Sequence, residues 1–278
     1  MKIAIQWIIP AVALAASGGC IATSSEVASR TYNFDGFDSV SARAGVNVVL
    51  KEGPYSVSAE APKNRLEKIV IEREGSTLVV RQEPHVSWMG WSTTPSIVTV
   101  VAPAYSRVEA SGGADVDASS LNGKALELHA SGGADINVGS IAVATLAINA
   151  GGGADINATS ITVDTATIHA GGGADVDVKT IKVATLGVDA SGGADISLAG
   201  TCTTLTAAAS GGADFNGGKL TCTDGVVTAS GGSDADITLT AKASGRASSG
   251  ADVRIRGNPT SVDTDSSGGG DVEVASGS

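Results

Sequence analysis

The chain has 278 residues, enough for one large domain or two small ones, but only 3% of them are aromatic and 37 are glycine. A core without large aromatic side chains needs many small aliphatic ones, and stacked β-structures bury such side chains in rows. The high glycine content would also suit a disordered chain, but the regular apolar rows described below exclude one. The formal net charge of −11 opposes binding to nucleic acid and to an anionic membrane face. Cations, neutral glycans and other proteins remain as partners.

The N-terminus has the pattern of an export signal. A positively charged start precedes an apolar run, Ile3–Ala16, and small residues stand directly before Cys20. This predicts a signal peptide over residues 1–19, and it resembles a bacterial lipobox, in which the cysteine carries a lipid and becomes the first residue. We therefore expect a lipid on Cys20, a tether over residues 20–30 and an exported outer-membrane lipoprotein, on the periplasmic or the surface face. Secretion with an unmodified Cys20 is the alternative; a spanning helix is disfavoured because the run is short and contains Pro10.

Residues 31–110 are expected to form the opening coils of a larger β-structure, or a cap over its exposed edge. Short apolar or alternating stretches predict strands, and Asn64–Lys68 is the one stretch capable of a helical turn. The expected strands are Ser39–Arg43, Val46–Lys51, Ser56–Ala61, Thr77–Gln82 and Ile97–Ala102.

A loop between Pro84 and Pro95 holds two of the three tryptophans of the chain, Trp88 and Trp91. The pair packs over the open end of the β-structure or contacts a ligand, because exposed tryptophans bind sugars and partner proteins well. Since the loop interrupts an otherwise regular chain, it is the expected place of ligand contact.

From residue 111 onward the chain repeats about every twenty residues. A Gly-Gly-Ala-Asp turn recurs at spacings of 20, 20, 20, 20 and 19 residues, and a Val, Ile or Phe follows its Asp. The Asp residues of these six turns are Asp115, Asp135, Asp155, Asp175, Asp195 and Asp214.

Within each repeat apolar and polar residues alternate, which is the period of a strand with one buried face. One coil cannot bury its inner face alone, so coils must stack, with each strand paired in parallel to its copy in the next repeat. No proline occurs between Pro103 and Pro259, where ladder N–H groups are needed on both sides. The sequence predicts an all-β chain in which residues 111–278 form a right-handed parallel β-helix with about twenty residues per coil. A helical solenoid is excluded because no segment has a 3.6-residue period.

Stacking aligns the six turn aspartates in one row, about 4.8 Å apart, which we call the Asp ladder. Neighbouring carboxylates at that distance repel by roughly 1 kcal/mol in bulk water. Either each Asp accepts hydrogen bonds from glycine N–H groups of its turn, the interpretation we favour, or a cation offsets the charge. Ca²⁺ suits such oxygen ligands, so it is the one cofactor left open. A second outward row, two residues further on, consists of Asp117, Asn137, Asn157, Asp177, Ser197 and Asn216.

Cys202 and Cys222 are twenty residues apart and continue an inward row of valines. On adjacent coils their Cα atoms would lie about 4.8 Å apart, within the range of a disulfide, which an oxidising envelope permits. A disulfide and two buried thiols therefore both remain open. His129 and His169 share an outward row two coils apart, about 10 Å, too far to ligate one metal. We expect both histidines to be solvated surface residues.

Several segments resemble the head GIN domain family, whose members are described as auto-transporter adhesins. Phe37-Asp-Ser-Val40, Gly45-Val-Asn-Val48 and Thr99-Val-Val-Ala-Pro103 lead into the glycine-rich Asp repeats, and the resemblance covers roughly residues 35–235. The turn here is Gly-Gly-Ala-Asp where the family has Gly-Ser-Gly-Asp. The resemblance implies a right-handed β-helix, a cell-envelope setting, often as a lipoprotein, and no catalytic residues.

The sequence therefore predicts a non-enzymatic cell-envelope protein, an adhesin or binding module for a glycan or protein ligand, attached to the membrane through its lipid and binding no nucleic acid. A carbohydrate-active β-helix enzyme is one alternative, disfavoured because the repeats have few basic residues and no long loops to form a cleft. A purely structural envelope spacer is the other.

Overall fold

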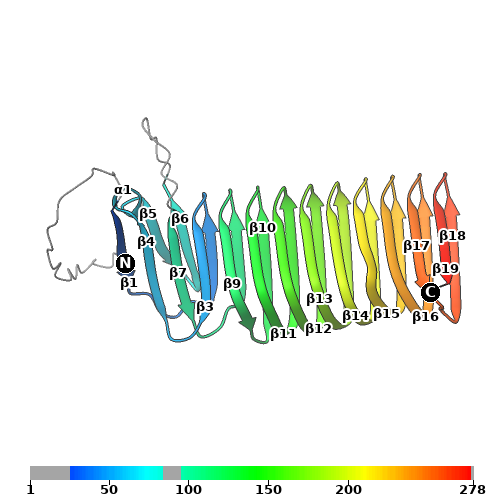
Figure 1. Cartoon of the computed structure of the whole chain (residues 1–278), viewed down its shortest axis with the longest axis horizontal. Helices are drawn as coiled ribbons and strands as arrows, with labels where there is room; N and C mark the ends of the chain where they lie inside the picture. Colours follow the sequence, from blue (N-terminus) through cyan, green and yellow to red (C-terminus); the bar gives the residue numbers. More distant parts are fainter. Residues whose placement is uncertain (1–25, 84–94, 277–278) are drawn as a thin grey trace, which may run out of the picture.

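The computed structural model describes residues 26–83 and 95–276, which form an elongated stack of β-coils (Figure 1). The coils follow one another along the long axis from the N-terminal end to the C-terminal end. Cys20, Trp88 and Trp91 lie outside the described residues. In the two described ranges, no helix is long and apolar enough to cross a membrane.

The elements in chain order are β1 (Val27–Tyr32), β2 (Ser39–Arg43), β3 (Asn47–Glu52), β4 (Ser56–Pro62), α1 (Lys63–Leu66), β5 (Ile69–Glu74), β6 (Thr77–Gln82), β7 (Ile97–Ala102), β8 (Arg107–Ser111), β9 (Asp115–Asn122), β10 (Ala125–Ser131), β11 (Asp135–Gly152), β12 (Asp155–Gly172), β13 (Asp175–Gly192), β14 (Asp195–Ser210), β15 (Asp214–Ser230), β16 (Asp234–Ser248), β17 (Asp252–Gly257), β18 (Ser261–Ser267) and β19 (Asp271–Ser276).

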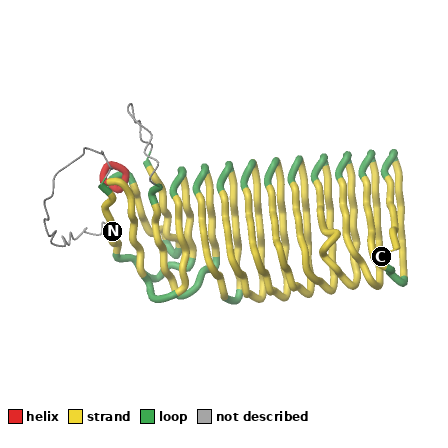
Figure 2. Tube along the Cα trace, viewed as in Figure 1, coloured by secondary structure: helices red, strands yellow, loops and turns green. Residues whose placement is uncertain are grey.

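From β8 onward the strands pair in parallel with the matching residues one repeat away. Asp135 lies beside Asp155, for example, and Ile136 beside Ile156. The fold class predicted from the repeat is confirmed: a parallel β-helix with roughly 20 residues per turn. The turns fall in line along one edge of the stack (Figure 2).

The core consists of small aliphatic side chains stacked in rows along the helix axis. Ile136, Ile156 and Ile168 are all 0% exposed, and the same holds for the alanines that precede each turn Asp, such as Ala154. Each fully buried Val, Leu or Ile contributes about 1.5–3 kcal/mol relative to an exposed one. A row repeated over many coils therefore stabilises the stack without large aromatic residues.

The glycine turns of successive coils also lie against one another and are joined by hydrogen bonds. The N–H of Gly173 donates to the carbonyl of Gly152 at 2.7 Å, and that of Gly193 to the carbonyl of Gly172 at 2.6 Å. Gly172 also has φ +81°, and a Cβ there would lie 2.9 Å from the Gly152 oxygen. Both the left-handed backbone and the close approach of the preceding coil require glycine at this position.

The N-terminal end differs from the rest because its strands turn antiparallel. β4 pairs antiparallel with both β1 and β7, and β5 with β6, whereas β2 and β3 pair in parallel with β8 and β9. The tether predicted over residues 20–30 is therefore too long, since β1 begins at Val27. Residues 27–32 form a strand because their main chain pairs with the edge of β4. Their side chains alternate between exposed and half-buried, so no buried row predicts this strand. The strand β5, Ile69–Glu74, was not expected from its sequence.

Candidate binding groove

A shallow groove with a volume of about 510 Å³ crosses five neighbouring strands, β3, β9, β11, β12 and β13. Two rows of outward side chains form its walls, and the backbone of a buried row, Ala118, Val138 and Ala158, forms its floor. The residues that line it are Val49, Leu50, Lys51, Asp117, Ala118, Ser119, Asn137, Val138, Gly139, Asn157, Ala158, Thr159, Asp177 and Lys179.

One wall of the groove is a ladder of amides, the Asn ladder, formed by Asn137 and Asn157. Nδ2 of Asn157 donates to Oδ1 of Asn137 at 3.2 Å, and Nδ2 of Asn137 donates to Oδ1 of Asp117 at 3.2 Å. Parallel pairing in register brings these residues side by side and continues the row to Asp177. All four side chains are exposed, so their remaining donors and acceptors are available to a ligand.

The other wall is lower, since Gly139 stands in it between Ser119 and Thr159. A Cβ at Gly139 would overlap the main-chain oxygen of Ser119, so the close approach of the two coils requires glycine. The absent side chain leaves the amides of the opposite wall open to solvent.

The groove is electrically balanced within an acidic protein. Its charged residues are two cations, Lys51 and Lys179, and two anions, Asp117 and Asp177. The whole chain carries a net charge of −11. A ligand in the groove therefore meets no excess of either sign from the lining itself.

The Asp ladder runs beside the groove, two residues earlier in each strand and on the same face. Pairing in register carries it from Asp214 through Asp234 to Asp252 and Asp271. The predicted hydrogen bonds from turn glycines to these carboxylates are wrong. Turn N–H groups such as that of Gly173 donate to carbonyls of the adjacent coil instead, because the turns stack as part of the ladder.

Burial and neighbouring charges change the pKa values of carboxyl groups in the Asp ladder. Burial, and then the charges of Asp135 and Asp175, raise the pKa of the Asp155 carboxyl above its ordinary value. Burial first and neighbouring carboxylates second also raise the pKa values of Asp115 and Asp195. Within residues 26–83 and 95–276, no group of three or more His, Cys, Asp or Glu side chains is arranged to hold a metal ion.

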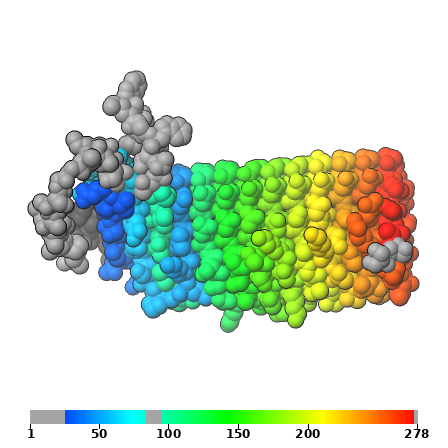
Figure 3. All heavy atoms as spheres, in the orientation of Figure 1, coloured from blue at the N-terminus to red at the C-terminus, as the bar shows by residue number. Residues whose placement is uncertain are grey.

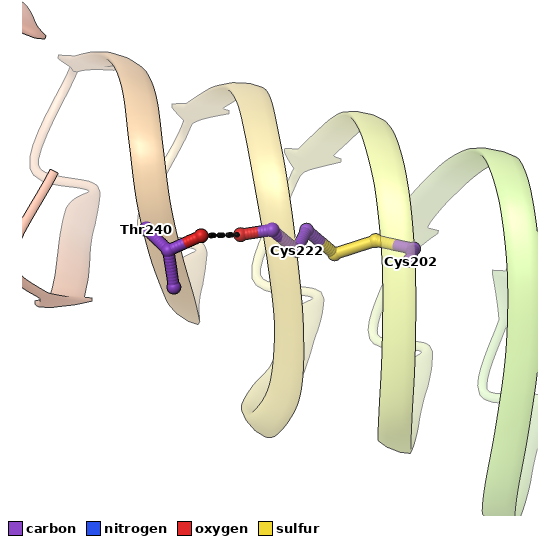
Figure 4. Close-up of a disulfide and its surroundings, with 3 residues drawn as sticks. All are labelled: Cys202, Cys222 and Thr240. Carbon is purple, nitrogen blue, oxygen red and sulfur yellow. Dashed lines mark hydrogen bonds between the residues drawn. A yellow bond between two sulfur atoms is a disulfide. The ribbon is translucent and has the colours of Figure 1, made fainter.

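Cys202 and Cys222 form a disulfide between β14 and β15, with Cα atoms 4.4 Å apart (Figure 4). They continue the row of Val183, and both are buried. The hydroxyl of Thr240 on the next coil donates to the main-chain oxygen of Cys222 at 3.3 Å. Of the two states that the sequence leaves open, the structure has the bridged one.

The histidines lie on the surface in register, as their spacing predicts. His129 pairs with Asn149, and Asn149 with His169 on the following coil. Nδ1 of His169 lies 3.7 Å from a carboxylate oxygen of Asp189, and both side chains are more than half exposed. The pair is separate from the groove.

Of the residues singled out in the sequence, the structure brings together the second outward row, from Asp117 to Asp177, and makes it a groove wall. Sequence reasoning found this row and left cation binding open for its oxygens as the less favoured alternative, but it missed the groove. The available signal was the adjacent asparagines at the same position of two repeats. An amide stack has donors as well as acceptors, and a carboxylate row does not.

Fold and groove together define a class of protein: a parallel β-helix with antiparallel strands at its N-terminal end and a polar groove along its side. The family model described as "putative auto-transporter adhesin, head GIN domain" matches residues 36–177 and again 146–259. The chain belongs to this head GIN domain family. No curated protein matches it.

Solved structures share the fold at low sequence identity. A putative adhesin from Parabacteroides distasonis superposes with a TM-score of 0.68 at 14% identity, covering 91% of this chain and 98% of the other. One from Parabacteroides merdae gives 0.60 at 16%, covering 90% and 97%. A putative lipid binding protein from Parabacteroides distasonis gives 0.59 at 12%, covering 91% and 97%.

Proposed function

We propose that this protein is a non-enzymatic binding module of the cell envelope, exported by the signal at residues 1–19, anchored by a lipid on Cys20, and contacting its ligand in the lateral groove. The groove carries the proposal, because it is a hollow lined by exposed, hydrogen-bonding side chains. The space-filling view shows successive segments of the chain as parallel bands across the face turned to the viewer (Figure 3).

Two observations support an envelope setting. The chain belongs to a family described as auto-transporter adhesins. Its Cys202–Cys222 bridge, moreover, is the kind of bond that persists in oxidising compartments and is rare in a reducing cytosol.

Catalysis in the groove is disfavoured by the separation of its acids. Asp117 and Asp177 are three coils apart in the paired register, about 14 Å. Glycoside hydrolases hold their two carboxyl groups about 5–9.5 Å apart. The amides between these aspartates neither donate a catalytic proton nor accept one at neutral pH. A binding role accounts for the lining without requiring either.

The test is a binding screen with matched variants of the purified chain, against immobilised glycans and extracellular-matrix proteins. The double variant Asn137→Leu/Asn157→Leu removes the hydrogen-bonding wall of the groove. Asn149→Leu is the control, because it makes the same change in β11, within the row that contains the histidines. We expect the double variant to lose binding and the control to retain it.

Equal binding by both variants would place the ligand site elsewhere, with the Trp88 and Trp91 loop as the next position to substitute. Release of shortened glycan products would point to the enzyme, and a failure of every probe to bind would favour the structural spacer. Far-UV circular dichroism of each variant checks that the β-helix is intact.

A further inference from the structure

The shape of the groove selects an extended chain as its ligand. Its lining comes from five adjacent strands, so it runs along the helix axis for about 19 Å at a spacing of about 4.8 Å. The groove is shallow and open to solvent, so a ligand contacts it along its length and is not enclosed by it. The floor is a sheet face rather than an edge, so a peptide cannot be added to it as a strand.

The hydrogen-bonding groups of the groove also repeat along it. A side-chain amide has two N–H donors and an oxygen with two lone pairs. Asn137 uses one donor toward Asp117 and one lone pair toward Asn157, which leaves one donor and one acceptor free in the exposed wall. Asn157, one coil further, likewise retains both kinds of group. A ligand that matches this wall must present donors and acceptors together at every step, as hydroxyl groups do.

The charges in and beside the groove further restrict the class of ligand. Within the lining, Lys51 and Lys179 balance Asp117 and Asp177. Beside it, the carboxylates of the Asp ladder repel a polyanion, since charges within about 10 Å are incompletely screened at moderate salt. The lining itself gives a polycation no net attraction, because Lys51 on the first strand of the groove and Lys179 on the last offset the two aspartates.

We propose that the groove binds a single, extended, uncharged polysaccharide chain, lying along the helix axis with its hydroxyl groups paired to Asn137 and Asn157. This deepens the proposed function and rests on it. Because the coils follow one another at a constant spacing, the bound length is set by the strands that the groove crosses, and affinity increases with each sugar unit until the groove is full.

The experiment is a calorimetric titration of the full chain with linear, uncharged oligosaccharides of increasing length, drawn from glucans, mannans and xylans. Oligogalacturonate, oligolysine and a proline-rich peptide are the charged and peptide probes. Affinity for an uncharged series should rise with length and then level off. It should change less than about twofold between low and high salt, since no net charge is exchanged. Asn137→Leu/Asn157→Leu should weaken it about tenfold or more, and Asn149→Leu should leave it unchanged.

Several outcomes separate the inference from the proposed function. If one of the charged or peptide probes binds and loses affinity in the double Asn variant, the groove is a binding site but the inference is overturned. If no probe of any class distinguishes the double variant from Asn149→Leu, both the inference and the proposed function fail. Salt-sensitive binding of an uncharged series, or affinity that is independent of length, would also contradict the axial, uncharged chain.

Discussion

At the scale of single residues, the turn between successive coils depends on one backbone position more than on its charged neighbour. Gly172 combines φ +81° with close main-chain contacts to Gly152, whereas a Cβ at Gly153 would meet nothing within 4 Å. The repeated Asp of each turn lies on the outer face, and the N–H groups of turn glycines such as Gly173 donate to carbonyl oxygens instead. Conformation at glycine therefore specifies the turn, and the carboxylate is tolerated there.

Gly172→Ala should destabilise the β-helix by about 2 kcal/mol, because alanine in the left-handed region costs about 1–2 kcal/mol and its Cβ also strikes the adjacent coil. Chemical denaturation of the variant measures the loss. Gly153→Ala is the matched control and should be within about 0.5 kcal/mol of the parent. Equal losses in both variants would contradict this account of the turn.

Asp155→Asn should stabilise the protein at pH 7. Burial and the charges of Asp135 and Asp175 raise the folded-state pKa of this carboxyl above its ordinary 3.8. The folded state therefore favours the protonated carboxyl. The stability that the protonated carboxyl contributes is complete below pH 3.8 and is lost as the pH rises through the raised pKa. An asparagine keeps the uncharged state at every pH.

The melting temperature of Asp155→Asn, measured from pH 3 to pH 8, should exceed that of the parent at the upper end and approach it at the lower end. Asp164→Asn on the same strand removes an equal charge outside the Asp ladder and is the control. A larger gain in the control than in Asp155→Asn would show that net charge, and not the ladder, is responsible.

At the scale of the elements, the repeat is least regular between β13 and β16. The pairing register shifts between Val178 and Ile181, again between Ser197 and Ala199, and twice more between β15 and β16. The disulfide joins β14 to β15 within this part of the stack, so a covalent bond holds together coils whose hydrogen-bonded ladder is interrupted.

Removing the bridge by Cys202→Val/Cys222→Val should cost about 3 kcal/mol, the chain-entropy value for a loop of this size. Valine continues the row of Val183, so packing is kept and the loss reports the crosslink. Because a solenoid opens locally, limited proteolysis should cut the variant first between β13 and β16. An unchanged rate of cleavage, with an unchanged denaturation midpoint, would show that the bridge adds nothing to the ladder.

At the scale of the whole molecule, the stack has antiparallel strands at its N-terminal end and carries the Asp ladder from Asp115 to Asp271. The ladder places like charges about 4.8 Å apart through successive coils, and salt screens them only in part at that distance. Stability should therefore depend on the ionic environment of the entire row and not on one site.

Added NaCl should raise the melting temperature by screening this row, and EDTA should leave it unchanged. Ca²⁺ should stabilise no more than Mg²⁺ at equal ionic strength, since the described residues hold no group of three or more suitable ligands. Differential scanning fluorimetry in the three salts measures the effect. A fall in melting temperature with EDTA that Ca²⁺ alone restores would establish a calcium ladder.

The sequence by itself determined the repeat, the period-two burial, the inward rows and thus the parallel β-helix, because stacking identical coils leaves one register that buries every apolar row. It also placed Cys202 above Cys222. Only the tertiary structure decided that they are bridged, that β1 extends the sheet at β4, and that the turn glycines bond to adjacent coils. The groove, too, required the structure: its depth depends on Gly139 and on how far the walls at Asn137 and Thr159 stand above the floor, and these are properties of neighbouring coils that no single repeat contains.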